Sequence, residues 1–133
     1  HTLFCQFGSH GAQQAATMKV VFAEFPGLAG CGQSFRLNDK WYAMYRFNPE
    51  MHVILVQDTK DMKGVPAPSV SGHLGQDAWP RARVLHVNGA PRGYLASKTF
   101  QQIVLGGLSW APGDVDADIT PNFCQVTPEA PTS

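Results

Sequence analysis

The chain has 133 residues, the length of one domain, and 44% of them are hydrophobic, which is enough to bury a core and excludes a disordered chain. Ten Lys and Arg balance ten Asp and Glu. Nucleic acids and anionic membranes attract an excess of basic residues, so this balance argues against both as main partners. No segment is apolar for long enough to span a bilayer.

Several short strands are predicted along the chain. Residues 17–22 (TMKVVF) are β-branched and read as a strand, and residues 25–27 (FPG) follow as a turn. Residues 34–45 are rich in aromatic side chains and fit either a strand or a short helix. Residues 83–87 (RVLHV) could form another strand.

Residues 52–57 (HVILVQ) form the clearest predicted strand. A nearly continuous apolar run is typical of a strand covered on both faces, as in a parallel sheet. We therefore expect an inner strand in which four side chains are strongly buried: Val53, Ile54, Leu55 and Val56.

Residues 97–110 form the best predicted helix. Ser97 can cap it, and its apolar residues follow helical spacing. We expect it to pack on the same sheet through Phe100, Ile103, Val104 and Leu108. Gly106 and Gly107 lower its intrinsic propensity and indicate close packing. The proline-rich residues 114–133 are predicted to form an extended tail over the body.

The three cysteines, Cys5, Cys31 and Cys124, are far apart in the sequence. An odd number without CxxC spacing favours free, partly buried thiols over a disulfide framework or a zinc site. No metal site is predicted.

Six blocks of the sequence, in this order, resemble the ThuA-like (trehalose-utilisation) family. They are residues 7–11 (FGSHG), 16–21 (ATMKVV), 35–42 (FRLNDKWY), 51–62 (MHVILVQDTKDM), 105–111 (LGGLSWA) and 116–127 (DADITPNFCQVT). The family is similar in fold to class I glutamine amidotransferases. The resemblance implies an α/β protein, part of an open flavodoxin-like sheet with flanking helices. Residues 1–113 would be the C-terminal part of that domain, and residues 114–133 its tail.

The function that the resemblance implies is the handling of trehalose, another disaccharide or a keto-sugar in carbohydrate utilisation, with a small carbohydrate as the ligand. Whether the chain is an enzyme, and with which cofactor, stays open. Nothing matches the family's opening strands, where its amidotransferase relatives place a nucleophile. Lys40 stands where the family has an acidic residue before Trp41 and Tyr42.

Residues 67–96 depart from the family altogether. The family has a Tyr-Pro-x-x-Trp element, a Gly-rich strand and a Gly-His-Arg-Glu-Asp block there. Back-translating this segment and reading it one base later restores much of that sequence. We therefore hypothesise a compensated frameshift, either a real allele or a sequencing error. Such a segment should be mostly irregular and poorly buried, with residues 84–87 as the exception.

Four residues are candidate carbohydrate ligands: His10, Asp39, Trp41 and Tyr42. Aromatic faces hold the apolar faces of sugars, and carboxylates hold their hydroxyls. The alternatives are that His10 is a loop histidine bonded to backbone, and that Trp41 and Tyr42 belong to the core while Asp39 caps a turn.

Two weaker site hypotheses remain. Asp58, Lys60 and Asp61 follow a predicted strand, where open α/β sheets bind ligands, although a solvated loop is the favoured interpretation. An N-terminal His1 with His10 could chelate copper, although His1 is more simply the edge of a fragment.

A competing function is a non-catalytic carbohydrate-binding or interaction domain, and a secreted copper-binding protein is a weaker alternative. Part of a sheet alone would expose strand edges. We therefore expect the chain to be aggregation-prone, or to be covered by a partner chain or a second copy of itself. The sequence leaves the location open between periplasmic or secreted and cytoplasmic.

Overall fold

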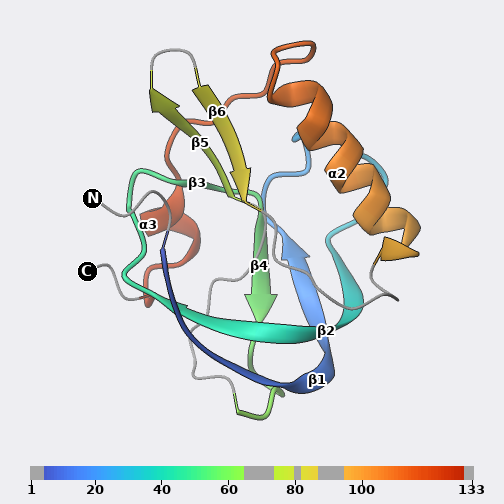
Figure 1. Ribbon diagram of the computed structural model, residues 1–133, viewed down its shortest axis with the longest axis vertical. Helices are drawn as coiled ribbons and strands as arrows, with labels where there is room; N and C mark the ends of the chain where they lie inside the picture. The colour runs from blue at the N-terminus through green and yellow to red at the C-terminus, as the bar shows by residue number, and fades with distance from the viewer. Residues whose placement is uncertain (1–4, 65–73, 80–81, 87–94, 131–133) are drawn as a thin grey trace.

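Two long strands, β1 (Gln6–Val20) and β2 (Ser34–Tyr45), pair antiparallel and form the largest element of the fold (Figure 1). The computed structural model describes residues 5–64, 74–79, 82–86 and 95–130. β2 resolves the ambiguity of residues 34–45 in favour of a strand. Its burial alternates with a period of two, so Leu37, Trp41 and Ala43 face the core while their neighbours face outward.

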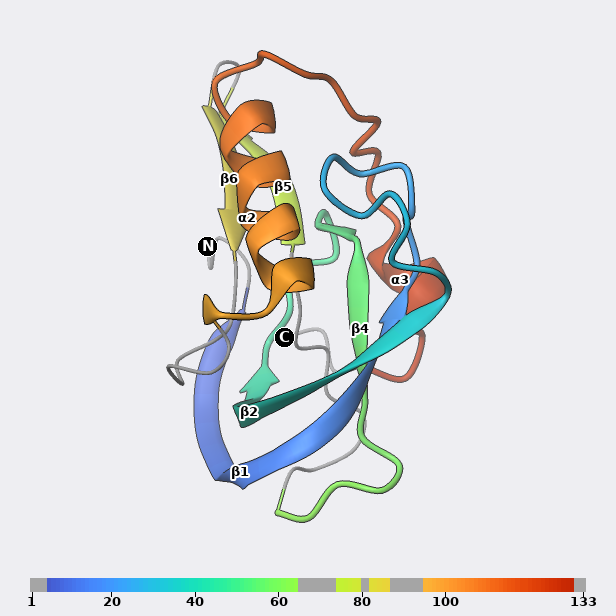
Figure 2. The same cartoon turned by 90° about the vertical axis from the view of Figure 1, so that its right-hand side faces the viewer.

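β1 begins eleven residues before the strand predicted at residue 17. Its register against β2 shifts twice, between Phe7 and Ser9 and between His10 and Gln13. Such bulges bend a strand and increase its twist. Figure 2 shows the result, in which β1 curves along one side of the molecule.

Residues 52–57 do not form the single inner strand that we predicted. They divide at Ile54 into β3 (His52–Val53) and β4 (Leu55–Asp58), which belong to different sheets. β4 lies at the edge of the sheet β2-β1-β4, and β3 lies at the edge of the sheet β3-β5-β6. Just beyond the last β1–β4 pair, the Ile54 carbonyl accepts hydrogen bonds from the amides of Val21 and Phe22 at 3.1 and 3.4 Å.

The burial predicted for this run is confirmed at three of the four positions. Val53, Ile54 and Leu55 are fully buried, whereas Val56 is only half-buried. Every strand pairing in the described part of the chain is antiparallel, so the parallel pairing expected there is wrong. The fold is a mixed α/β arrangement of antiparallel sheets and helices.

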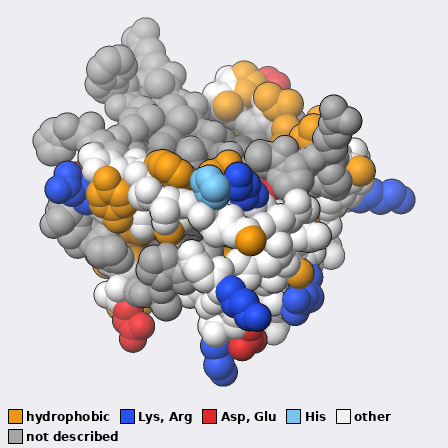
Figure 3. Space-filling view, turned by 60° about the horizontal axis from the view of Figure 1, so that its bottom comes forward, with side chains coloured by type: hydrophobic (Ala, Val, Ile, Leu, Met, Phe, Trp, Pro, Cys, Tyr) orange, Lys and Arg blue, Asp and Glu red, His pale blue; other side chains and the backbone are white. Residues whose placement is uncertain are grey.

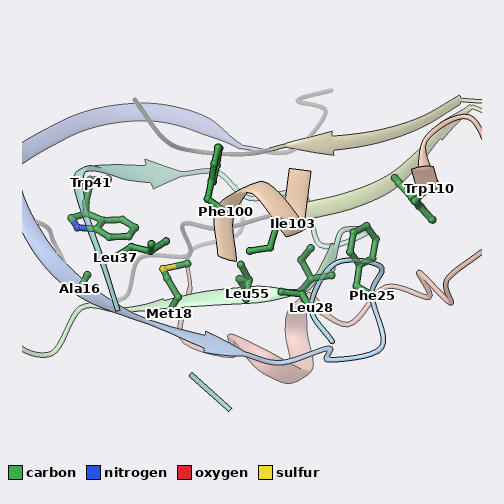
Figure 4. Close-up of a cluster of buried hydrophobic side chains, with 12 residues drawn as sticks. Ala16, Met18, Phe25, Leu28, Leu37, Trp41, Leu55, Phe100, Ile103 and Trp110 are labelled. Carbon is green, nitrogen blue, oxygen red and sulfur yellow. The ribbon is translucent and has the colours of Figure 1, made fainter. Parts of the chain in front are cut away.

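Helix α2 (Lys98–Trp110) begins where the sequence predicts. The Ser97 hydroxyl accepts a hydrogen bond from the Phe100 amide at 3.4 Å. Phe100, Ile103 and Trp110 are buried, and Figure 4 shows Ile103 between the helix and Leu55 of β4. These side chains belong to the main cluster of buried hydrophobic residues. It consists of Ala16, Met18, Phe25, Leu28, Leu37, Trp41, Ala43, Ile54, Leu55, Phe100, Ile103 and Trp110.

Two details of α2 differ from the prediction. Leu108 is 64% exposed and does not reach the core, because it lies five residues after Ile103 and therefore points to a different side of the helix. Gly106 packs closely, but against the Pro26–Gly27 turn rather than a sheet. A Cβ at Gly106 would overlap the Pro26 carbonyl.

The C-terminal residues are not simply an extended tail. Phe123 begins the short helix α3 (Phe123–Val126) and is 1% exposed. Its ring centroid lies 5.4 Å from that of Phe47. A second cluster forms around them from Phe47, Met51, Val53, Phe123 and Ala130.

Asn122 joins this segment to β3. Its Oδ1 accepts from the Val53 amide at 2.6 Å, and its Nδ2 donates to the Val53 carbonyl at 2.9 Å. Its own amide donates to the Met51 carbonyl at 3.2 Å. The side chain therefore occupies the place of a further strand beside β3.

The segment hypothesised to be out of frame contains two strands, β5 (Leu74–Trp79) and β6 (Ala82–His86). β6 corresponds to the strand predicted at residues 83–87, and β5 was not predicted. We also expected this segment to be poorly buried and its other parts to be irregular. Both expectations concern features that fall outside the described residues.

Candidate functional site

Three aromatic rings meet on the outer face of the β1–β2 pair. Phe7 and Tyr42 lie edge to face with their centroids 5.5 Å apart and their planes at 71°. The His10 ring also lies edge to face with Tyr42, with their centroids 6.3 Å apart and their planes at 89°. We call Phe7, His10 and Tyr42 the aromatic platform.

The strand register explains why these rings meet. His10 pairs directly with Tyr42, so their side chains share one face of the sheet, and Phe7 lies diagonally from Tyr42 across the first bulge. Directly paired side chains in an antiparallel ladder have Cβ atoms about 5 Å apart, which suits ring contacts. The histidine predicted in a loop therefore lies in a strand.

Polar groups border the platform near the end of β2. Tyr45 lies against Gly8, where an added Cβ would come within 3.1 Å of the Tyr45 ring. The Arg46 guanidinium lies 5.9 Å from the centre of the Tyr45 ring and donates to Gln6 Oε1 at 3.4 Å. Arg46 has a φ of 52°, a left-handed conformation that is uncommon outside glycine.

The platform is open to solvent. Phe7 is 54% exposed, His10 is exposed and Tyr42 is half-buried. In Figure 3, a histidine lies on the molecular surface with hydrophobic side chains along part of its border and a basic side chain directly beside it. Ring faces offer apolar contact, while the Tyr42 hydroxyl and the His10 nitrogens can donate and accept hydrogen bonds.

Asp39 and Trp41 lie on the opposite, inner face of β2. Asp39 is 1% exposed and accepts from the Lys40 amide at 2.6 Å; Trp41 is 2% exposed and donates from its Nε1 to the Gln14 carbonyl at 2.7 Å. The structure thus brings His10 and Tyr42 together and places Asp39 and Trp41 beneath them. Phe7 was missed as a site residue because the strand was predicted to begin after it.

A second polar region surrounds the end of β4. Asp58 binds Lys19 Nζ at 2.8 Å and accepts from the Lys60 amide at 3.1 Å. The Lys19 hydrogen bond is the main reason why the pKa of Asp58 is lowered. A hollow of about 300 Å³ lies here, between β4 and residues 126–130. Lys19, Asp58 and Glu129 all line this hollow, and the first two are paired with each other.

The described residues contain no group of three or more His, Cys, Asp or Glu side chains able to hold a metal ion. His52 is buried, with its Nδ1 2.7 Å from the Thr120 carbonyl and its ring against Phe22. His1 lies outside the described residues, so the copper hypothesis remains a prediction.

Cys5, Cys31 and Cys124 are all free, as the sequence predicts, although Cys124 is exposed rather than partly buried. None of the helices in the described ranges has the length and apolar character needed to cross a membrane. Comparison with known proteins finds no matching family model, no matching curated protein and no matching solved structure.

Proposed function

We propose that this chain is a ThuA-like domain that binds a small carbohydrate, such as trehalose or another disaccharide, on the aromatic platform. The observation that carries the proposal is the contact of Phe7, His10 and Tyr42 on one exposed face. A sugar ring has an apolar face of C–H groups and a rim of hydroxyls. It suits a surface with exposed rings at its centre and hydrogen-bonding groups among them.

Asp39 and Trp41 have an indirect role in this proposal. Their burial keeps them from a sugar on the outer face. The Trp41–Gln14 hydrogen bond joins β2 to β1 near the platform and maintains the spacing of the two strands. Tyr42 and His10 are the members of the predicted set that would touch the ligand.

Titration with trehalose, followed by NMR chemical shifts, tests the proposal. We expect shifts at Phe7, His10 and Tyr42, and about fivefold weaker binding in Phe7→Ala and Tyr42→Ala, since a ring contact contributes about 1 kcal/mol. Leu95→Ala is the matched control, because Leu95 is 63% exposed but outside the platform. Equal weakening in the control, or shifts confined to other regions, would contradict the proposal.

Catalysis is a separate part of the question. The ThuA-like resemblance favours an enzyme acting on disaccharides or keto-sugars, whereas an exposed platform favours binding without chemistry. Incubating the chain with a keto-disaccharide and measuring products distinguishes the two. Binding without turnover would support the non-catalytic alternative.

The finer fold assignment belongs to the same proposal. A flavodoxin-like sheet is mainly parallel, and such sheets often carry an antiparallel edge strand. The antiparallel strands of this chain would then extend the edge of a larger sheet. An experimental structure with a parallel strand paired to β4 or β2 would support this assignment, and pairing limited to the present antiparallel order would refute it.

A further inference from the structure

The outer face of α2 carries two strongly exposed leucines. Leu105 and Leu108 are 63% and 64% exposed, and the only other exposed residues of the helix are Lys98, Gln101 and Gln102. No charged residue occurs between Lys98 and Asp114. Two large side chains exposed about one turn apart make this part of the helix a candidate interaction surface.

A hollow next to these leucines gives the surface shape. It has a volume of about 370 Å³ and lies between α2 and the loop that contains Pro26 and Ala29. Leu105 forms one of its walls. Figure 1 shows α2 at one side of the molecule, where another chain could reach it. A projecting leucine beside a hollow can fit a surface that carries the same pair of features.

The charges at the two ends of the face decide which partner it suits. Lys98 begins the helix, and Asp114 follows its end. Both are exposed, and neither forms a salt bridge within the described part of the chain. At 1.5 Å per residue the helix is about 20 Å long, so opposite charges lie at opposite ends of an apolar stripe.

We infer that α2 is the interface of a homodimer, in which the helices of two copies pack antiparallel about a twofold axis near Leu105. A twofold axis brings each patch against itself, so the apolar stripe is covered by an identical stripe. Antiparallel packing also brings Lys98 of each copy close to Asp114 of the other. Parallel packing would instead bring like charges together.

The geometry is consistent along the helix. Lys98 lies seven residues before Leu105, and Asp114 lies nine residues after it. Lys98 therefore lies roughly 10 Å from Leu105 along the helix axis. On the other side of Leu105, the helix continues to Trp110, and the turn that follows, in which the Asp114 amide donates to the Ser109 carbonyl, holds Asp114 at the opposite end of the face. Lys98 and Leu105 are two turns apart and therefore share one face.

Sedimentation equilibrium of the chain between about 1 and 100 μM measures the association directly. We expect a dimer that dissociates on dilution, and a monomer throughout this range for Leu105→Lys, because two buried ammonium groups would face each other at the axis. Phe7→Lys is the matched control. It also adds a lysine at an exposed apolar position, but on β1, so the dimer should persist while sugar binding is lost.

Charge reversal tests the orientation. Lys98→Glu and Asp114→Lys should each weaken the dimer about tenfold, because each change turns two attractive contacts into repulsive ones. The double variant should recover to within about threefold of the original. Both reversals place favourable charges at the ends of the α2 dipole, so weaker association cannot be attributed to loss of the helix.

Three outcomes would overturn the inference. They are a monomeric chain at every concentration, a dimer that survives Leu105→Lys, and a double charge reversal as weak as the single ones. A chain that stays monomeric would mean that the outer face of α2 does not bind a second copy and is open to a different protein. Sugar binding by Leu105→Lys separates a failure of this interface from a failure of the proposed function.

Discussion

Cys5 and Cys124 differ greatly in their surroundings. Burial raises the pKa of the Cys5 thiol to about 11, whereas Cys124 is exposed. Alkylation requires the thiolate, so iodoacetamide at about pH 8 should label Cys124 well before Cys5. Mass spectrometry of timed samples follows the order, and urea should remove the difference. Equal rates in the native chain would show that Cys5 is not shielded.

Asp58 connects the pH of the solution to stability. Its pKa is lowered in the folded chain by Lys19, so its carboxylate stabilises the fold above the ordinary Asp pKa, and this contribution is lost as the pH falls through the lowered value. Asp58→Asn should therefore lower the Tm at pH 7 but not at about pH 2. Because both partners are partly exposed, the effect should not exceed about 1 kcal/mol.

Asp61→Asn provides the control for this measurement, since Asp61 is exposed in the same loop and makes no salt bridge within the described residues. A pH-independent difference between the original chain and Asp58→Asn would mean that the ion pair does not stabilise the fold.

At the scale of elements, α2 has one buried and one exposed face. Ile103→Ala should destabilise the fold by about 2–5 kcal/mol, because Ile103 is fully buried. Leu108→Ala should cost less than about 0.5 kcal/mol in dilute, monomeric solution. Urea unfolding monitored by circular dichroism measures both. Similar losses would mean that Leu108 packs in the core after all.

The approach of α2 to the Pro26–Gly27 turn depends on glycine from both sides. A Cβ at Gly106 would overlap the Pro26 carbonyl, and one at Gly27 would overlap the Gln102 carbonyl. Gly106→Ala should therefore destabilise the fold by about 1–3 kcal/mol, despite the better helix propensity of alanine. Gln102→Ala, on the exposed side, should have almost no effect. Measuring the Tm of each variant tests this expectation. A higher Tm for Gly106→Ala than for the original chain would refute the close contact.

The helix was predictable and the strands were less so. Ser97 and Pro112 mark the limits of α2, and apolar residues at helical spacing lie between them, so local signals suffice. The first half of β1 contains Gly8, Gly11 and Ala12, which favour no strand by themselves. Pairing with β2 overrides this low propensity, and pairing partners distant in the sequence are not visible in a local pattern.

The same distinction applies to the candidate site. Once residues 34–45 are assigned as a strand, alternation requires Trp41 and Tyr42 to face opposite sides. The contact of Tyr42 with Phe7 and His10 depends on bulges in β1, which the sequence does not reveal. A continuous apolar run also cannot distinguish one covered strand from a chain that crosses between two sheets at Ile54.

At the scale of the whole molecule, two clusters of buried side chains share the stability. The second depends on Phe123, so Phe123→Ala should cost about 3–5 kcal/mol, and removing residues 114–133 should prevent cooperative folding. Guanidinium unfolding measures the first effect, and near-ultraviolet circular dichroism the second. Cys124→Ala, at an exposed neighbour, should leave stability unchanged. A cooperative melt in the shortened chain would show that the C-terminal residues merely cover the fold.

Asn122 and Val53 are 69 residues apart in the sequence. At about 5–20 residues per second, a ribosome needs roughly 3–14 s to proceed from one to the other. During that interval Met51 and Val53 have been synthesised, but Phe123 and Asn122, which will cover them, have not. A nascent chain of this protein therefore exposes an apolar strand to its surroundings until residues 122 and 123 have been made, and chaperones would have those seconds in which to bind it.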